Sequence, residues 1–215
     1  MGIIKPLDAK IANMIAAGEV VERPASIVKE LVENSIDAMA TSITVEIKGF
    51  GMSLIKVVDN GVGMDKADLK MAFYRHATSK IYEESDLHSI NSLGFRGEAI
   101  PAIASVSKMT IASRQKGGIG HQITFEGGHY KSDGAASINE GTEVIVTNLF
   151  YNTPARFKYI KSERAEILAI TEIFERLAIV NPHIRFELII DNRSIRKTLG
   201  QDDASSIESS IYGPN

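Results

Sequence analysis

The decapeptide KELVENSIDA, residues 29–38, lies in the stretch that decides the fold. Apolar residues recur around it at helical spacing, which predicts an amphipathic helix over residues 24–39. Glu30, Asn34 and Asp37 lie together on the opposite side of this helix. A solvated helix face explains such residues when they are taken alone, but a glutamate and an asparagine one turn apart also suit a bound ligand. The apolar positions expected to face the core are Ile27, Val28, Leu31, Val32, Ile36 and Met39.

Segments rich in β-branched residues follow, and Gly-containing links between some of them indicate hairpins. The predicted strands are 42–48, 53–59, 108–114, 120–126, 142–148 and 184–190. The predicted helices are 8–17, 24–39, 66–77, 95–107 and 162–180. Helices at both ends of a run of hairpin-joined strands favour an α/β (α+β) fold, a two-layer sandwich of helices on a mixed β-sheet. A regular doubly wound fold is not expected.

Composition restricts the classes of protein to which the chain can belong. Its 215 residues are 44% hydrophobic, enough for a sizeable core. No apolar run approaches the roughly 18 residues that span a bilayer, and the first residues lack a secretory core, so we expect a cytoplasmic protein with no membrane partner. The absence of cysteine excludes disulfides and thiolate chemistry, and the five histidines lack the spacing of a zinc site.

A net charge of −3 does not indicate a dedicated nucleic-acid binder. One local basic strip, ARFKYIKSER at residues 155–164, interleaves basic residues with Phe157 and Tyr159. We interpret it as the solvated start of a basic helix, with a nucleic-acid contact as the alternative.

The segment VVDNGVGM, residues 57–64, ends an apolar strand with a carboxylate. Asp59, Gly61 and Gly63 form the pattern Asp-x-Gly-x-Gly. A tight turn alone accounts for Asn-Gly. A buried carboxylate at this position also suits a hydrogen bond from an exocyclic amine such as adenine N6, and glycines let a planar base approach the backbone closely.

Two further segments suit a nucleotide. SLGFRGEAI, residues 92–100, places glycines before a predicted helix, where free N–H groups favour phosphate, although a plain loop and cap explain it as well. Gly141 and Thr142 open a strand and offer a hydroxyl. The dipeptide Gly-Lys does not occur, so a nucleotide site in this chain is not a P-loop.

Five segments together resemble, in the same order, signatures of the MutL mismatch-repair proteins, a branch of the GHKL superfamily of ATPases. They are IANMIAAGEVVERPASIVKELVENSIDA, DNGVGM, RHATSK, SLGFRGEA and LFYNTPAR. The resemblance implies a GHKL (Bergerat) ATP-binding fold with ATP and Mg²⁺ as cofactors. Histidine kinases of the same superfamily generally lack the glutamate that matches Glu30, and the chain shows no phospho-acceptor helix, which argues against a kinase.

The resemblance implies a role for each matching residue. Glu30 corresponds to the general base that polarises the attacking water, Asn34 to the magnesium ligand and Asp59 to the partner of the adenine amine. Asp37 would order the magnesium shell or cap local polar groups. Gly63 would line the base pocket and Thr142 would assist through water. The residues expected to contact the nucleotide are Asn34, Ala38, Asp59, Gly61, Gly63, Met64, Thr78, Ser79, Lys80, Leu93, Gly94, Phe95, Arg96, Gly97 and Thr142.

The resemblance also implies an organisation and partners. Residues 1–20 would form an arm with a possible dimer contact, 21–200 the ATP-binding domain, and 201–215 a linker toward a second subdomain that supplies a lysine to the γ-phosphate. The implied partners are ATP and ADP, a second copy through the N-terminal region, a MutS-type mismatch-recognition protein, other repair enzymes, and DNA bound weakly and without sequence preference. Two functions are compatible with these expectations, an ATPase that switches a dimer and a nucleotide-clamped scaffold with negligible hydrolysis.

Overall fold

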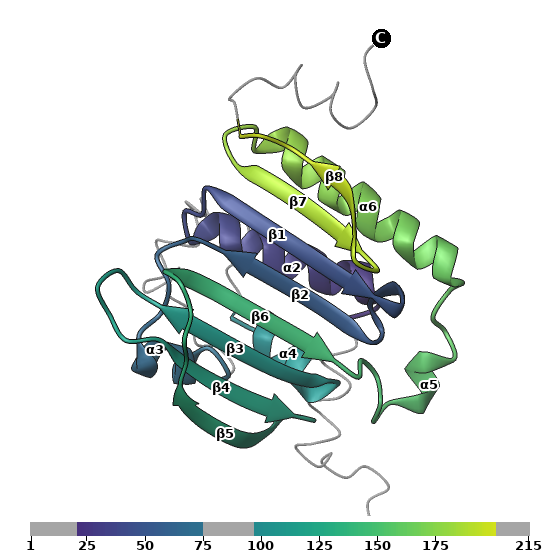
Figure 1. The fold of residues 1–215 in the computed structure, drawn as a ribbon. Coiled ribbons are helices and arrows are strands. Elements are labelled where there is room, and N and C mark those ends of the chain that lie inside the picture. Colours follow the sequence, from purple (N-terminus) through teal and green to yellow (C-terminus); the bar gives the residue numbers. More distant parts are fainter. Residues whose placement is uncertain (1–20, 75–96, 201–215) are drawn as a thin grey trace, which may run out of the picture.

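A computed structural model of the chain describes residues 21–74 and 97–200. Figure 1 shows an eight-stranded sheet in the order β5-β4-β3-β6-β2-β1-β7-β8. β1 and β7 pair in parallel, and the other pairs in the sheet are antiparallel. The strands are β1 (Ser42–Lys48), β2 (Leu54–Asp59), β3 (Lys108–Arg114), β4 (His121–Glu126), β5 (His129–Ala135), β6 (Gly141–Thr147), β7 (Arg185–Ile190) and β8 (Arg193–Lys197).

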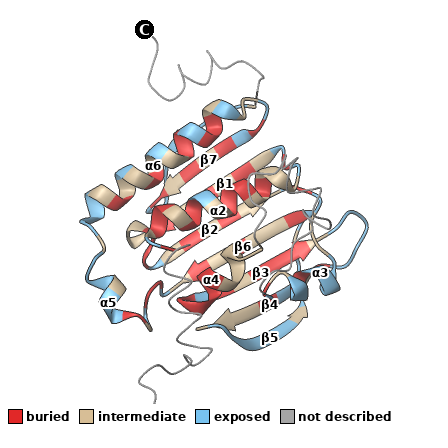
Figure 2. Ribbon diagram, turned by 180° about the vertical axis from the view of Figure 1, so that it is seen from behind, coloured by how far each residue is buried: buried red, intermediate tan, exposed pale blue. Residues whose placement is uncertain are grey.

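Helices cover one face of this sheet. The view from behind shows α2, α4 and α6 lying over it (Figure 2), which confirms the predicted two-layer fold with a mixed sheet. Within the described ranges, no helix has the length and apolarity to cross a membrane. The helical segments are α2 (Pro24–Asp37), η1 (Gly49–Gly51), α3 (Lys66–Met71), α4 (Ala99–Ser105), α5 (Pro154–Phe157) and α6 (Glu163–Val180).

The core lies between the helices and the sheet. Alternate residues of β1 are fully buried on the helix side, Ile43, Val45 and Ile47, as period-two alternation requires. On α2 the predicted apolar positions Ile27, Val28, Leu31 and Val32 are buried, and Ile36 packs partly buried against the same cluster.

The prediction for Met39 was wrong. Helix α2 ends at Asp37, and Met39 adopts a left-handed backbone conformation with φ of 59°. Its side chain is 77% exposed. The chain reverses here to enter β1, with the N–H of Met39 donating to Ile36 and the N–H of Ala40 donating to Ser35. Extending the helical period by two residues therefore assigned Met39 to the wrong environment.

Four elements were not predicted from the sequence, the strands β5 and β8 and the short helices η1 and α5. Strands β5 and β8 are the two edges of the sheet, and nearly all of their residues are exposed. Such strands have no alternation of apolar and polar residues to reveal them. The short α5 overlaps the start of the basic strip, and α3 ends at Met71 rather than continuing to residue 77. The predicted helix 8–17 lies outside the described residues.

A partly buried ion pair fixes the start of α2 on α6. Arg23 Nε lies 3.0 Å from Glu166 Oε2, and the side chain of Glu166 is only 1% exposed. The other carboxylate oxygen of Glu166 accepts a hydrogen bond from the backbone N–H of Lys161. These contacts join the helix that carries Glu30 to the segment that leads into α6.

Candidate nucleotide-binding site

Asp59, the last residue of β2, forms the centre of the site. Its Oδ1 accepts hydrogen bonds from the backbone N–H groups of Gly61, at 2.9 Å, and Thr142, at 3.2 Å. Its Oδ2 accepts one from Ser35 Oγ on α2, at 2.8 Å. The carboxyl group is therefore held between the end of β2, the start of β6 and the sheet-facing side of α2.

Burial raises the pKa of Asp59 above the ordinary value for an aspartate. The hydrogen bonds from Gly61, Ser35 and Thr142 act in the opposite direction, because each one stabilises the carboxylate form. A further hydrogen-bond donor that contacts the carboxyl group would favour its ionised form in the same way.

The two glycines of the turn after β2 allow close backbone contacts. A Cβ on Gly61 would lie 2.6 Å from the carbonyl oxygen of Ala38, which accepts a hydrogen bond from Val62. Gly63 has φ of 68°, and a Cβ there would overlap the carbonyl of Arg114. The sequence suggested that these glycines make room for a base. In the structure they also let the turn pack against α2 and β3.

A second hydroxyl group holds the same turn from the other side. Ser113 Oγ, on β3, accepts a hydrogen bond from the backbone N–H of Met64 at 2.8 Å. It also lies 3.0 Å from the carbonyl oxygen of Gly141 and 2.9 Å from Thr142 Oγ1. The segment 59–64 is therefore fixed by side chains from two elements distant in sequence.

Glu30 and Asn34 stand one turn apart on α2, both partly buried. Lys29 Nζ lies 3.8 Å from Glu30 Oε1 and 3.0 Å from Glu33 Oε2. The carboxamide of Asn34 carries no charge, and its oxygen is of the kind that coordinates a hard cation. Asp37 and Ala38 follow on the same helix end, and both are partly buried.

Comparison with known proteins gives the family. The profile described as "Histidine kinase-, DNA gyrase B-, and HSP90-like ATPase" matches residues 22–150. An Aquifex aeolicus structure, "MutL ATPase domain complexed with ADP", is 31% identical with a TM-score of 0.73, and the match covers 90% of this chain and 70% of that one. The chain belongs to the MutL family of these ATPases.

Other relatives agree with this assignment. A structure described as the N-terminal domain of a DNA repair protein matches with a TM-score of 0.80 at 30% identity, covering 97% of this chain and 62% of that one. The DNA mismatch repair proteins MutL of Staphylococcus carnosus and Macrococcus caseolyticus are 50% and 51% identical over 99% of the chain. The chain spans about a third of the length of these two relatives, 33% and 34%.

The structure describes only part of the expected site of this MutL-family domain. The predicted site residues that it describes come from α2 and its C-cap, from the end of β2 and the turn after it, and from the start of β6. They are Glu30, Asn34, Ala38, Asp59, Gly61, Gly63, Met64 and Thr142. Gly97 also lies in the described part, with φ of 60°, two residues before α4. The remaining predicted contacts, Thr78, Ser79, Lys80, Leu93, Gly94, Phe95 and Arg96, lie outside the described residues.

Sequence reasoning missed Ser35 and Ser113. Both are buried, at 3% and 0% exposure, and both hold the turn that carries Asp59. One signal was available for Ser35, because a hydroxyl residue falls among the core-facing positions of an otherwise apolar helix arc. Ser113 lies opposite Thr142 near the end of β3, and only the strand pairing shows this.

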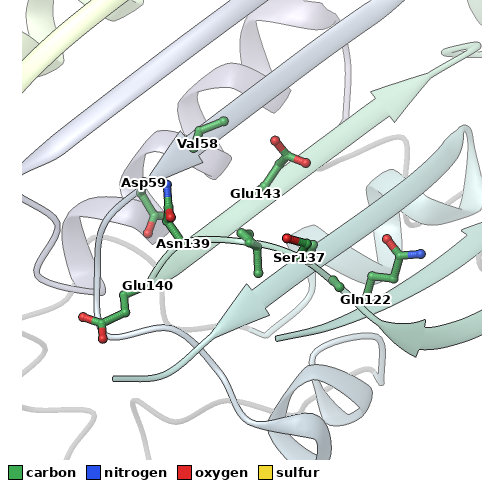
Figure 3. Close-up of a pocket in the computed structure, with 10 residues that line it drawn as sticks. Val58, Asp59, Gln122, Ser137, Asn139, Glu140 and Glu143 are labelled. Atoms are coloured by element: carbon green, nitrogen blue, oxygen red, sulfur yellow. The ribbon is translucent and has the colours of Figure 1, made fainter. Parts of the chain in front are cut away.

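A hollow of about 280 Å³ lies behind Asp59, on the face of the sheet that the helices leave open. Figure 3 shows Val58, Glu143 and Gln122 from three strands, with Ser137, Asn139 and Glu140 from the segment before β6. Val58 and Glu143 alternate with the core residues Val57 and Val144, which places them on the face away from α2. Asp59 thus lies between the predicted nucleotide site and this hollow.

Proposed function

We propose that this MutL-family domain binds ATP with Mg²⁺ and hydrolyses it. The observation that carries the proposal is the hydrogen bonding of Asp59, a partly buried carboxylate at a strand end with three of its acceptor positions already occupied. One acceptor position remains, which suits a single donor such as the adenine amine. The ADP complex of the Aquifex aeolicus relative supports a nucleotide as the ligand.

The side chains of α2 fit a magnesium ion carried by the nucleotide. Among the described residues, no group of three or more His, Cys, Asp or Glu is arranged to hold a metal. Mg²⁺ takes six oxygen ligands and keeps several waters, so phosphate oxygens with the Asn34 amide oxygen are a suitable set. When bound, the ion would supply neutralisation of the phosphate charge.

Three parts of the chain would then have separate roles in binding and hydrolysis. Asp59 accepts from the base and fixes the orientation of the nucleotide. Glu30, one turn before Asn34, orients a water toward the γ-phosphate and accepts its proton; a positioned base of this kind contributes about 10²–10⁴-fold to the rate. The backbone of the 61–64 turn excludes water from one side of the base.

We place this reaction within a MutL-type mismatch repair protein. There the nucleotide state would drive dimerisation through residues 1–20 and signalling to a MutS-type protein and other repair enzymes, with 201–215 leading to a further subdomain. These expectations rest on the resemblance and on the MutL relatives. The compartment proposed for the whole protein is the cytoplasm.

Binding and turnover separate the proposal from the clamp alternative. We expect Glu30→Ala to retain ATP affinity, measured by calorimetry with Mg²⁺, and to lose at least about tenfold of any turnover. Asp59→Asn should lose affinity, and Glu172→Ala, which removes an exposed carboxylate of α6, should change neither quantity. Binding without turnover in the parent chain would favour the nucleotide-clamped scaffold, and absence of binding would overturn the proposal.

A further inference from the structure

Ser35 holds a hydroxyl group that has two possible acceptors and one proton. Its Oγ lies 2.8 Å from Asp59 Oδ2 and 3.1 Å from the backbone carbonyl oxygen of Leu31. A hydroxyl donates one hydrogen bond at a time and accepts up to two. The side chain is buried on the sheet side of α2, at 3% exposure. Ser35 therefore changes direction according to what Asp59 presents to it.

The hydrogen bonds of Asp59 determine where a proton on its carboxyl group can lie. Both acceptor positions of Oδ1 are taken by the N–H groups of Gly61 and Thr142. A proton on Asp59 must therefore reside on Oδ2, which faces Ser35. In that state Oδ2 donates to Ser35 Oγ, and the hydroxyl turns its own proton to the Leu31 carbonyl. In the ionised state Ser35 donates to Oδ2 instead.

Whether Asp59 is ionised or protonated, Oδ2 forms one hydrogen bond with Ser35 and keeps one lone pair that can accept from the ligand. We propose that Ser35 determines base specificity, by keeping Asp59 a hydrogen-bond acceptor toward the ligand whether or not Asp59 carries a proton. The ligand class selected is a purine nucleotide with an amine at position 6. A 6-oxo purine is rejected, because its O6 and Asp59 Oδ2 are both hydrogen-bond acceptors.

The inference rests on the proposed function, since it assumes that a purine base contacts Asp59. Beyond that function, it gives the consequence of removing the Ser35 hydroxyl. In Ser35→Ala a proton on Oδ2 no longer has a partner on α2 and is available to the ligand. The neutral aspartic acid then donates to a 6-oxo group as well as it accepts from an amine, and the discrimination is lost.

Ionisable groups on the open face and on α2 are the alternatives to Asp59 as the source of a pH response. Glu140 and Glu143 line the hollow that Asp59 also reaches, and Glu143 is paired with Lys56 at 2.6 Å. Along α2, Asp37 lies two residues after Ser35. A variant at exposed Glu140 controls for a pH response that does not come from Asp59.

The test compares ATP with inosine triphosphate, which differs in its 6-oxo group and the proton on N1. Affinities are measured by calorimetry with Mg²⁺ for the wild type, Ser35→Ala, Ser35→Thr and Glu140→Gln, from about pH 8 down to the lowest pH at which each chain stays folded. The wild type and Glu140→Gln should keep the preference for ATP throughout. In Ser35→Ala the preference should fall at least about tenfold as the pH decreases, and Ser35→Thr should restore it.

The outcomes separate the two proposals. Equal weakening of both nucleotides in Ser35→Ala, with the preference unchanged, would make Ser35 purely structural and overturn the inference while ATP binding stands. A wild type that binds neither nucleotide would overturn the proposed function itself. If Ser35→Thr does not fold, Ser35→Cys, a weaker donor of similar size, serves as the intermediate case and should give an intermediate preference.

Discussion

At the scale of single residues, Asp59 couples the protein to pH through a pKa that burial raises. The folded, nucleotide-free domain holds this proton more tightly than the unfolded chain does. The stability contributed by the group is therefore present below the unfolded pKa and is lost as the pH rises through the folded pKa. Nucleotide binding has the opposite dependence, because an amine donates more strongly to a carboxylate than to a neutral acid.

We expect ATP affinity to fall as the pH decreases through the raised pKa of Asp59, at a higher pH than an ordinary aspartate would give. Calorimetry across the acidic range, with proton release followed in two buffers, measures both the affinity and the linked proton. In Asp59→Asn the remaining weak affinity should vary little over the same range. An equally steep pH dependence in that variant would assign the proton to another group.

Two glycines allow strain and crowding to be measured separately. Gly63 and Gly117 have nearly the same φ, 68° and 71°, but a Cβ on Gly63 would overlap the Arg114 carbonyl whereas one on Gly117 meets nothing within 4 Å. Gly117→Ala should destabilise the domain by about 1–2 kcal/mol, the cost of the left-handed conformation alone. Gly63→Ala should cost about 2 kcal/mol more, since backbone must move. Urea unfolding gives both values, and equal costs would contradict the crowding.

At the scale of elements, the Arg23–Glu166 pair ties the start of α2 to α6. Glu166→Ala leaves the guanidinium of Arg23 without its buried partner, and we expect a loss of about 2–3 kcal/mol in the free energy of unfolding. Glu163→Ala, an exposed position in the same helix turn, should change it by less than about 0.5 kcal/mol. A double-mutant cycle with Arg23→Ala isolates the pair, and a coupling energy near zero would refute the role given to it.

Elements with a buried face were predictable, and edge elements were not. The periodicity of α2, α6, β1 and β2 follows from packing against one core, so the residues themselves carry the signal. The edges β5 and β8 are held mainly by backbone hydrogen bonds to a neighbour, which leave no pattern in side chains. Ser113 was missed for a different reason. Its partners Met64 and Gly141 are distant in sequence and contact it only in the assembled sheet.

At the scale of the whole molecule, stability should decrease from the centre of the sheet toward its edges. Ile55 on β2 and Ile43 on β1 are fully buried, while β5 and β8 present almost entirely exposed residues. Native-state hydrogen exchange should therefore show the amides of β1 and β2 exchanging only with global unfolding, and those of β8 through local opening at lower free energy. Equal protection of β8 and β2 would contradict this gradient.

The family assignment and the fold came from the sequence because the motifs of α2 and of the β2 turn are both local. The arrangement that makes Asp59 a site is not local, since it joins Ser35, Gly61 and Thr142 from three parts of the chain. The residue types in these motifs indicated which side chains were candidates for the nucleotide site. The hydrogen-bond directions on the carboxyl group, which the specificity proposal uses, required the folded arrangement.

The hollow behind Asp59 makes the domain suitable as an optical sensor. The chain contains no cysteine and no tryptophan, so one engineered thiol would carry the only label and no indole emission would interfere. Ser137 is exposed and lines the hollow on the face away from α2. An environment-sensitive dye attached there would sit behind the carboxylate without obstructing the ligand, and its emission would follow occupancy of the opposite face in real time.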